Sequence, residues 1–227
     1  MRELFQLIMG LCVGYAAISL AESFLHKNVQ HASTKTLAFW RRHPRLFKPF
    51  LRAYYAHHVI HHIKTFRQNH VTQFESSGEK AAVDALLDNT HGDGIKRERY
   101  GVTLVGLGVL RFIAPVSFLI PLLYLVGGPF VLAGALVPIV VYPMMSKFIH
   151  PCLHMRHDEA LRAASGFKRW LLQTRYMKFI ARHHYLHHRH MKYNFNLLWG
   201  GDFLLGVHRR PSSKDLVKMR ALGLPTD

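Results

Sequence analysis

Apolar residues are concentrated in two long regions of the chain, and polar, basic segments separate them. The first region runs from Leu4 to Leu25 and carries a single charge, Glu22, near its end. About 20 apolar residues are enough to cross a bilayer as a helix. The second region runs from Tyr100 to Ile149 and is interrupted by Gly-Gly-Pro at 127–129. Each half is long enough to span, so the pattern predicts a helical hairpin and about three spanning helices in total.

The polar segments are also expected to be helical. Residues 37–42 form an interfacial stretch that is broken at His43-Pro44. A helix is expected from about Pro49 to Arg67, and a short amphipathic helix from Gly78 to Asn89, where apolar residues recur at helical spacing. The predicted fold class is an all-α integral membrane helical bundle with a helical cap, forming a single domain over residues 1–227.

The distribution of charge sets the expected orientation. The 227-residue chain is 49% hydrophobic, yet its formal net charge is +17. Residues 26–100 hold 13 Lys and Arg, residues 147–227 hold 15, and the turn at 127–128 holds none. Because basic loops tend to stay in the cytoplasm, both regions are expected on the cytoplasmic side of a bacterial inner membrane. Nucleic acid is not an expected partner, since the basic residues form no continuous stripe with stacking aromatics.

Histidine is the compositional outlier, with 18 residues against 13 acidic ones. The histidines are clustered in four boxes, and all four fall in the two regions predicted to be cytoplasmic. In chain order the spacings are H-x4-H, H-x2-HH, H-x3-H and H-x2-HH. The box histidines are His26, His31, His58, His61, His62, His150, His154, His184, His187 and His188.

These spacings suit metal ligands. Residues three and four apart share a helical face, so the second and fourth boxes each project three imidazoles together. His26 and His31 lie about 140° apart around a regular helix, and they converge only if the helix ends or bends between them. Ten imidazoles shared by two ions give five each and leave an octahedral position for O2. This arithmetic favours two iron ions in the cap, although zinc could replace iron in purified protein.

The ordered set of boxes resembles the membrane fatty acid hydroxylase/sterol desaturase superfamily of histidine-box di-iron oxygenases. The resemblance covers His26 to about Pro211, and residues 66–99 look like an insertion. Departures occur after the last box: Asn196 stands where the family has Gly, and two glycines separate Trp199 from Asp202. The tail residues that resemble the family pattern are Asn194, Phe195, Asn196, Trp199, Asp202, Leu205, Gly206 and Pro211.

The resemblance implies a membrane-bound, O2-dependent oxidoreductase that hydroxylates or desaturates an unactivated C–H bond of a lipid-like substrate. It also implies a separate electron-transfer protein as partner. The metal rather than an acid–base pair would carry the reaction, so no catalytic residue is expected beyond the metal ligands. The sequence neither names the substrate nor separates hydroxylation from desaturation.

Residues near the boxes carry weaker expectations. Glu22 is expected either to accept a hydrogen bond from a ligand imidazole or to be an interfacial carboxylate. Asn194 and Asp202 are candidates for the same supporting role. A register shift of one residue would exchange His57 for His58. The histidines expected at the surface are His43, His70, His91 and His208.

The alternative from another functional class is a histidine-rich membrane metal transporter or metal-binding protein. A transport pathway places ionisable residues in the middle of its spans. Here the middle of the predicted hairpin is apolar and the histidines fall at the ends of the spans. The oxygenase is therefore the preferred hypothesis.

Overall fold

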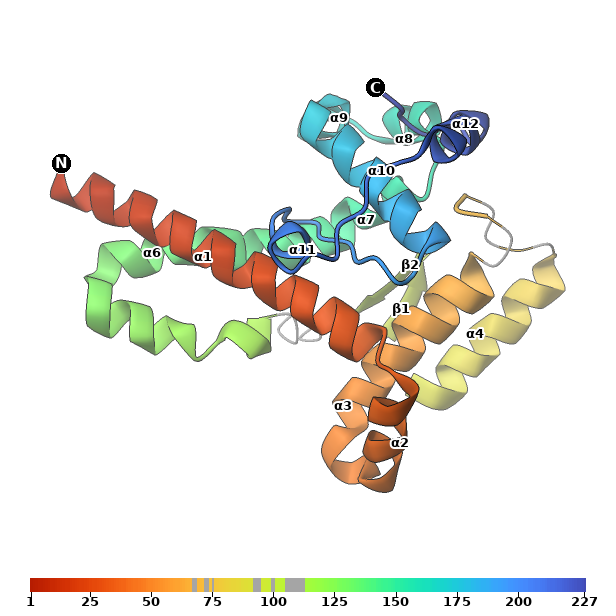
Figure 1. Cartoon of the computed structure of the whole chain (residues 1–227), viewed down its shortest axis with the longest axis horizontal. Coiled ribbons are helices and arrows are strands. Elements are labelled where there is room, and N and C mark those ends of the chain that lie inside the picture. The colour runs from red at the N-terminus through yellow and green to blue at the C-terminus, as the bar shows by residue number, and fades with distance from the viewer. Residues whose placement is uncertain (67–68, 72–73, 75, 92–94, 99–100, 105–112) are drawn as a thin grey trace.

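The computed structural model is predominantly helical and describes the chain except for residues 67–68, 72–73, 75, 92–94, 99–100 and 105–112 (Figure 1). The N-terminal helices are α1 (Arg2–Leu25), η1 (His26–Gln30), α2 (Thr34–Arg42), α3 (Pro44–Tyr54), η2 (Tyr55–Thr65) and α4 (Ser77–His91). The later helices are η5 (Ala114–Val116), α6 (Leu119–Phe148), α7 (His150–Leu153), α8 (His157–Ala163), α9 (Gly166–Gln173), α10 (Arg175–Arg189), α11 (Gly201–Leu204) and α12 (Ser213–Ala221). Of these, η1 and η2 are π-helices and η5 is a 3₁₀ turn.

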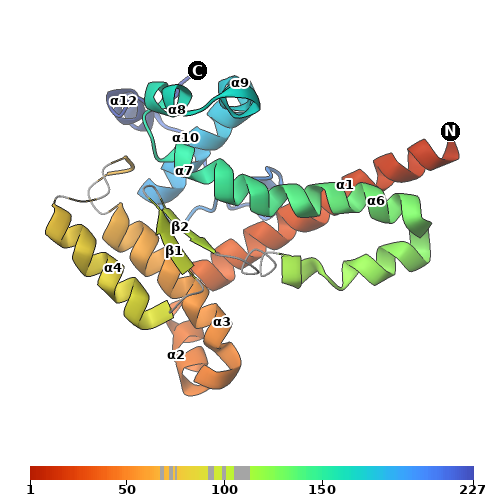
Figure 2. The ribbon, with the colours of Figure 1, turned by 180° about the vertical axis from the view of Figure 1, so that it is seen from behind.

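A short β-hairpin departs from the predicted all-α fold. Strands β1 (Ile95–Glu98) and β2 (Gly101–Leu104) pair in antiparallel fashion, and the hairpin packs beside α4 and η2 (Figure 2). The sequence predicts that residues 101–104 begin a spanning helix, and this prediction is wrong. Glycine and β-branched residues are poor helix formers, and Val102 and Thr103 favour strands.

Two helical segments of the described chain are long and apolar enough to cross a membrane, Arg2–Gln30 and Leu119–Phe148. Most of each apolar stretch is exposed, since only 22% and 28% of it is buried inside the protein. The third predicted span is not found in the described residues. Part of its range forms β2, and residues 105–112 are not among the residues that the structure describes.

The predicted turn at 127–129 is confirmed. Gly128 interrupts α6 with a φ of 75° and a ψ of −173°, and the chain turns back there, as the green ribbon at the end of the molecule shows (Figure 1). A positive φ costs L-residues about 1–2 kcal/mol, whereas glycine adopts it freely. Pro129 then begins the returning limb, where its fixed φ suits the first turn of a helix.

The returning limb of α6 packs along α1 through three glycines. A Cβ atom added to Gly10 would lie 2.0 Å from the carbonyl oxygen of Val131, and one added to Gly134 would lie 2.1 Å from that of Leu7. Gly14 makes the same kind of approach to the backbone of Ala135. Small residues allow two backbones to touch in this way, as is common between membrane helices. The resulting glycine seam (Gly10, Gly14 and Gly134) fixes how α1 and α6 lie side by side.

The main hydrophobic core lies where the α1–α6 pair meets α7 to α10. It includes Ile18 from α1, Ile139 from α6, Leu153 from α7 and Ile180 from α10, each at most 2% exposed. Burying such a side chain contributes about 1.5–3 kcal/mol. This core therefore joins the end of the apolar helices to the helix that carries the last histidine box.

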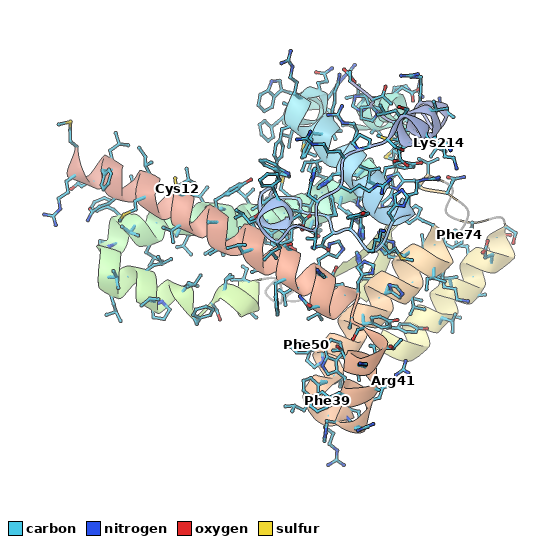
Figure 3. All side chains as sticks on the ribbon, viewed as in Figure 1. Cys12, Phe39, Arg41, Phe50, Phe74 and Lys214 are labelled. Carbon is cyan, nitrogen blue, oxygen red and sulfur yellow. The ribbon has the colours of Figure 1, made fainter. Side chains whose placement is uncertain are left out.

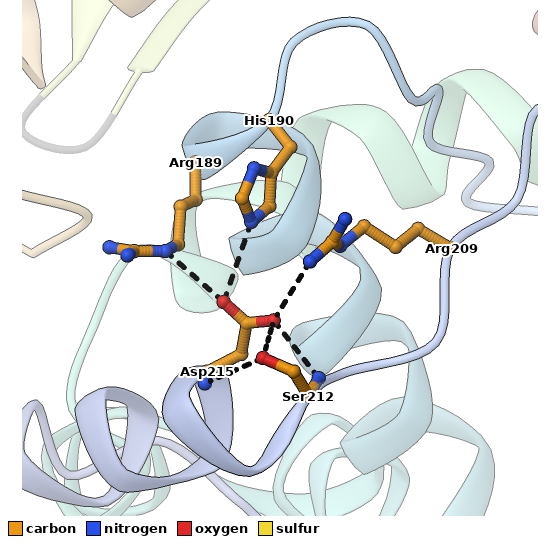
Figure 4. A network of polar contacts seen from close by, with 5 residues as sticks. All are labelled: Arg189, His190, Arg209, Ser212 and Asp215. Carbon is orange, nitrogen blue, oxygen red and sulfur yellow. Dashed lines mark hydrogen bonds and ion pairs between the residues drawn. The ribbon is translucent and has the colours of Figure 1, made fainter.

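The C-terminal helix α12 is held against α10 by a buried carboxylate, Asp215 (Figure 4). Asp215 accepts hydrogen bonds from the backbone and hydroxyl of Ser212 and forms ion pairs with Arg189 and Arg209 at 3.1 and 3.3 Å. Burial alone would raise the pKa of Asp215, but the Ser212, Arg209 and His190 contacts outweigh it and hold the pKa below its usual value. The network fixes the end of α10 next to its histidines.

Candidate metal centre

Nine histidine side chains converge in two neighbouring groups. Within each group the nitrogen atoms available for coordination lie within 4.8 Å of one another, and neither group contains a carboxylate or thiolate. The five-histidine group comprises His26, His31, His57, His62 and His187. The four-histidine group comprises His61, His154, His184 and His188.

The Nε2 atoms form a continuous series of short contacts in each group. In the five-histidine group, Nε2 of His57 lies 2.9 Å from that of His26 and 3.1 Å from that of His62. The series continues from His62 to His187 at 3.0 Å and from His187 to His31 at 3.2 Å.

In the four-histidine group the corresponding Nε2 series is equally tight. His154 lies at its centre, 2.8 Å from His184 and 3.2 Å from His61. His61 then lies 3.2 Å from His188. Each group therefore presents several ring nitrogens to one point, as a coordination site requires.

A π-helical turn explains how His26 and His31 meet. The backbone N–H of His31 donates to the carbonyl of His26 at 3.0 Å, an i→i+5 hydrogen bond. Side chains five residues apart lie one turn apart in such a helix, whereas they diverge in a regular α-helix. The expectation that the helix must end or bend here is met by a widened turn at its end.

The same device changes the register of the second box. Because η2 is π-helical, residues four and five apart share a face, and the N–H of Phe66 donates to the carbonyl of His61. His57 therefore joins the five-histidine group together with His62, while His61 points to the other group. His58, a predicted ligand, lies outside both groups; its Nδ1 is 2.9 Å from the Nδ1 of His31.

The fourth box lies on a regular α-helix, and its three histidines come together as their spacing predicts. Thr174 caps α10 by accepting a hydrogen bond from the N–H of Met177. His184 and His188, one turn apart, join the four-histidine group, and His187 reaches the five-histidine group. The adjacent residues His187 and His188 thus connect the two groups, as His61 and His62 do on η2.

The third box is divided. His154 is fully buried and belongs to the four-histidine group. His150 lies beside that group without joining it, with its ring centroid 4.6 Å from that of His184 and 5.1 Å from that of His61. Eight of the ten predicted ligands are therefore in the two groups, and His58 and His150 are adjacent to them. Metal binding by any of these histidines stays a prediction.

Backbone carbonyls set the tautomer of three group members. Nδ1 of His26 lies 2.9 Å from the carbonyl oxygen of Phe195, and Nδ1 of His187 lies 2.8 Å from that of Tyr193. Nδ1 of His154 lies 3.0 Å from the carbonyl of His70. A carbonyl can only accept, so each Nδ1 carries the proton and each Nε2 directs a lone pair into its group. This is the usual arrangement of metal-ligating histidine.

Burial keeps the groups uncharged. It lowers the pKa of His187 and of His150 to about 4, with neighbouring histidines adding to the effect. The pKa of His31, His61 and His184 is lowered in the same way, first by burial and then by nearby histidines. Neutral imidazoles with converging lone pairs and no acidic partner fit a metal cation. The cation would accept the lone pairs, which otherwise repel one another. Imidazole suits iron, zinc, copper and nickel alike.

A network of polar side chains supports the five-histidine group from behind. The carboxylate of Glu22 accepts hydrogen bonds from the backbone N–H of Leu197 at 2.7 Å and of Leu198 at 3.1 Å. No imidazole among the described residues donates a hydrogen bond to it, so the first of the two expectations for Glu22 is not met. Glu22 instead ties α1 to the loop whose Phe195 carbonyl orients His26.

Asn194 and Asp202 belong to the same supporting network. The Asn194 amide donates to Asp202 Oδ1 at 2.8 Å and to the carbonyl of Ser23, and the Ser23 hydroxyl donates to the same carboxylate oxygen. Burial raises the pKa of Asp202 to about 6, against the opposing effect of the Ser23 and Asn194 hydrogen bonds. These contacts fix the loop after α10 to the end of α1.

His57 and His70 lie outside the predicted ligand set, yet the structure places His57 in a group and His70 beside one. His70 was expected at the surface but is 3% exposed; its Nε2 bonds the carbonyl of Leu153 at 2.7 Å, and its own carbonyl orients His154. No local spacing signals this long-range contact. His43 is exposed as expected and His208 is partly exposed, while the side chain of His91 lies outside the described residues.

Comparison with known proteins adds no relative: no protein family, curated protein or solved structure matches the chain. The geometry of the chain is therefore the basis for assigning a function. The chain combines two groups of mostly buried histidines that could hold metal ions with two helices apolar enough to cross a membrane.

Proposed function

We propose that the protein is a membrane-bound non-haem di-iron oxygenase that hydroxylates or desaturates an unactivated C–H bond of a lipid-like substrate. The observation that carries the proposal is the pair of adjacent all-imidazole groups, five histidines and four, at the end of two apolar helices. The order of the histidine boxes and its resemblance to the fatty acid hydroxylase/sterol desaturase superfamily support it further.

The number of donors in the five-histidine group favours iron over zinc. Structural zinc is almost always held by four ligands in a tetrahedron. The five-histidine group offers one donor more than this geometry uses, and five nitrogens leave one octahedral position open. Two iron ions held by these groups would supply the O2 activation and electron transfer that C–H oxidation needs, with electrons from a separate carrier protein.

The protein's own residues would hold and orient the centre. The carbonyls of Phe195, Tyr193 and His70 fix three imidazoles with their lone pairs inward. Phe66 stacks on His154 with ring centroids 3.7 Å apart, and Phe195 lies over His184 at 4.4 Å. These aromatic rings cover part of the four-histidine group, which would limit the access of water to a reactive metal centre and so its side reactions.

The alternative, a metal transporter, fits less well. Its ligands should lie along the spans to form a pathway. All nine grouped histidines lie at or beyond the ends of the apolar helices, starting with His26, which directly follows α1. The two basic segments that follow the apolar regions in the sequence also contain the histidines, which favours a cytoplasmic position for them.

The test is to purify the protein from iron-supplied cells and to measure metal per chain together with Mössbauer spectra. We expect about two iron ions per chain and a spectrum of two coupled, nitrogen-rich sites. Lipids from cells with and without the gene should differ by one added oxygen atom or by two lost hydrogen atoms. Folded, detergent-stable protein that binds one metal ion or none would contradict the di-iron proposal.

A further inference from the structure

A cavity of about 540 Å³ lies directly beside the five-histidine group. Its wall includes His31, a member of that group, and Tyr193, whose carbonyl orients His187. The volume is within the range of about 300–1,000 Å³ that is typical of small-molecule sites. Whatever occupies this cavity lies against a candidate metal ligand.

The part of the cavity wall next to the end of α1 is apolar. Phe24, on the last turn of α1, is 58% exposed and lines it, as does Phe50 of α3, which is 41% exposed. Figure 3 labels Phe50 on the α2–α3 pair, and its ring lies 5.4 Å from that of Trp40, another lining residue. Because Phe24 faces outward from a candidate membrane span, the cavity connects that outer face with the histidines.

The polar part of the cavity wall is positively charged. Lys27 and Lys192 line it, and none of its described lining residues is a carboxylate. The ammonium group of Lys192 lies 5.1 Å from the centre of the Tyr193 ring, which holds it at the wall. The N-terminus of α2 also faces the cavity through Ser33 and Thr36, and a helix N-terminus favours negative charge.

We infer that this cavity is a recognition site for the anionic headgroup of a single-chain amphiphile. Lys27 and Lys192 bind the carboxylate or phosphate group, while the alkyl chain follows Phe24, Phe50 and Trp40 toward the membrane. Lys27 lies in η1, and His31 directly follows that helix, four residues or about one turn further on. An anion on Lys27 therefore brings only the carbons next to the headgroup to His31. This inference rests on the proposed function: the carbon that is oxidised would then lie close to the anionic headgroup of the amphiphile.

The test measures binding to the purified protein in zwitterionic nanodiscs by displacement of a fluorescent fatty acid. The probes are palmitate, hexadecyl phosphate and hexadecanol, which share a chain and differ in headgroup. We expect the two anions to bind about 10-fold more tightly than the alcohol, as for a charge-assisted contact. The ratio of palmitate to hexadecyl phosphate then tells a carboxylate site from a phosphate site.

The variant K27M/K192M should remove the preference for anions, and K27R/K192R should restore most of it. The matched control is K35M/K48M, which removes two exposed lysines of α2 and α3 that do not line the cavity. Equal binding of palmitate and hexadecanol to the unchanged protein would overturn the inference. An equal loss of the preference for anions in K27M/K192M and K35M/K48M would also overturn it.

A second readout separates this inference from the proposed function. Charge-dependent binding without iron-dependent oxidation would support the cavity and reject the oxygenase. Iron-dependent oxidation that is insensitive to K27M/K192M would support the oxygenase and reject the anion site. Where both hold, fragment masses of the product should place the change within the first few carbons from the headgroup.

Discussion

The two histidine groups differ in how open they are. In the five-histidine group, His31 and His57 are partly exposed and His31 lines the cavity. In the four-histidine group only His188 is partly exposed, while His154 and His184 are completely buried and each contacts a phenylalanine ring. Under the proposed function, this difference predicts that substrate would approach the five-histidine group rather than the four-histidine group.

The groups also differ in the backbone that builds them. Four members of the five-histidine group come from or border π-helices, whereas two members of the four-histidine group come from the regular helix α10. Single π-helical turns are rare and are frequent at functional sites. The five-histidine group is thus built mostly on π-helical backbone, whereas the four-histidine group takes only His61 from a π-helix.

The largest effects should come from removing one ligand from each group. His62→Ala and His184→Ala should each lose one of two bound metal ions, because each group is expected to hold its own. Activity should fall by more than about 100-fold, which is the upper end of the loss expected when a residue that supports a ligand is replaced. Elemental analysis and turnover check this, with exposed His43→Ala as control. Two metals retained in either variant would contradict the assignment of separate groups.

The register of η2 gives the next sharpest comparison. His57→Ala removes a donor from the five-histidine group and should lose its metal ion. His58→Ala leaves all nine donors and removes only a contact to His31, so it should cost no more than about 10-fold in activity, the lower end for supporting residues. Metal content of the two variants decides between them. The reverse order would show that the second box is wound as a regular α-helix.

Supporting residues should affect the two groups selectively. Glu22→Gln weakens the hold on the loop behind His26, and His70→Ala removes the contact to Leu153 next to His154. Each should reduce activity by about 10–100-fold. Cobalt-loaded protein should show a changed spectrum for the five-histidine group in the first variant and for the four-histidine group in the second. Identical spectral changes would mean that the groups do not respond separately.

The smallest effect concerns pH. Histidine has a pKa of about 6.5 when unfolded, while burial lowers that of His187 and His150 to about 4 in the folded protein. Between these values the unfolded chain binds more protons, so stability should fall as pH decreases from about 6.5 to about 4. Asp202, with its pKa raised to about 6, opposes this with the effect of one group. Melting temperatures of metal-free protein check the slope; a rise toward pH 4 would contradict it.

The sequence predicted what depends on local spacing and composition. The apolar blocks, the turn at 127–129 and the convergence of the fourth box on α10 all follow from residue type and period. The π-helices could not be predicted, because the same residues suit an α-helix and the wider winding comes with tertiary packing. His70 meets Leu153 across 83 positions of the chain, and a single histidine has no periodicity to reveal such a contact.

The glycine seam between α1 and α6 has a mechanical consequence. Bilayers differ in thickness, and spanning helices adapt mainly by tilting. α1 ends just before His26 of the five-histidine group, and α6 ends six residues before His154 of the four-histidine group, so sliding between the helices would separate donors of the two groups. Because their backbones touch at Gly10, Gly14 and Gly134, the helices form one rigid pair. If the pair spans a membrane as proposed, a thicker or thinner bilayer would reorient the whole histidine assembly without stretching it.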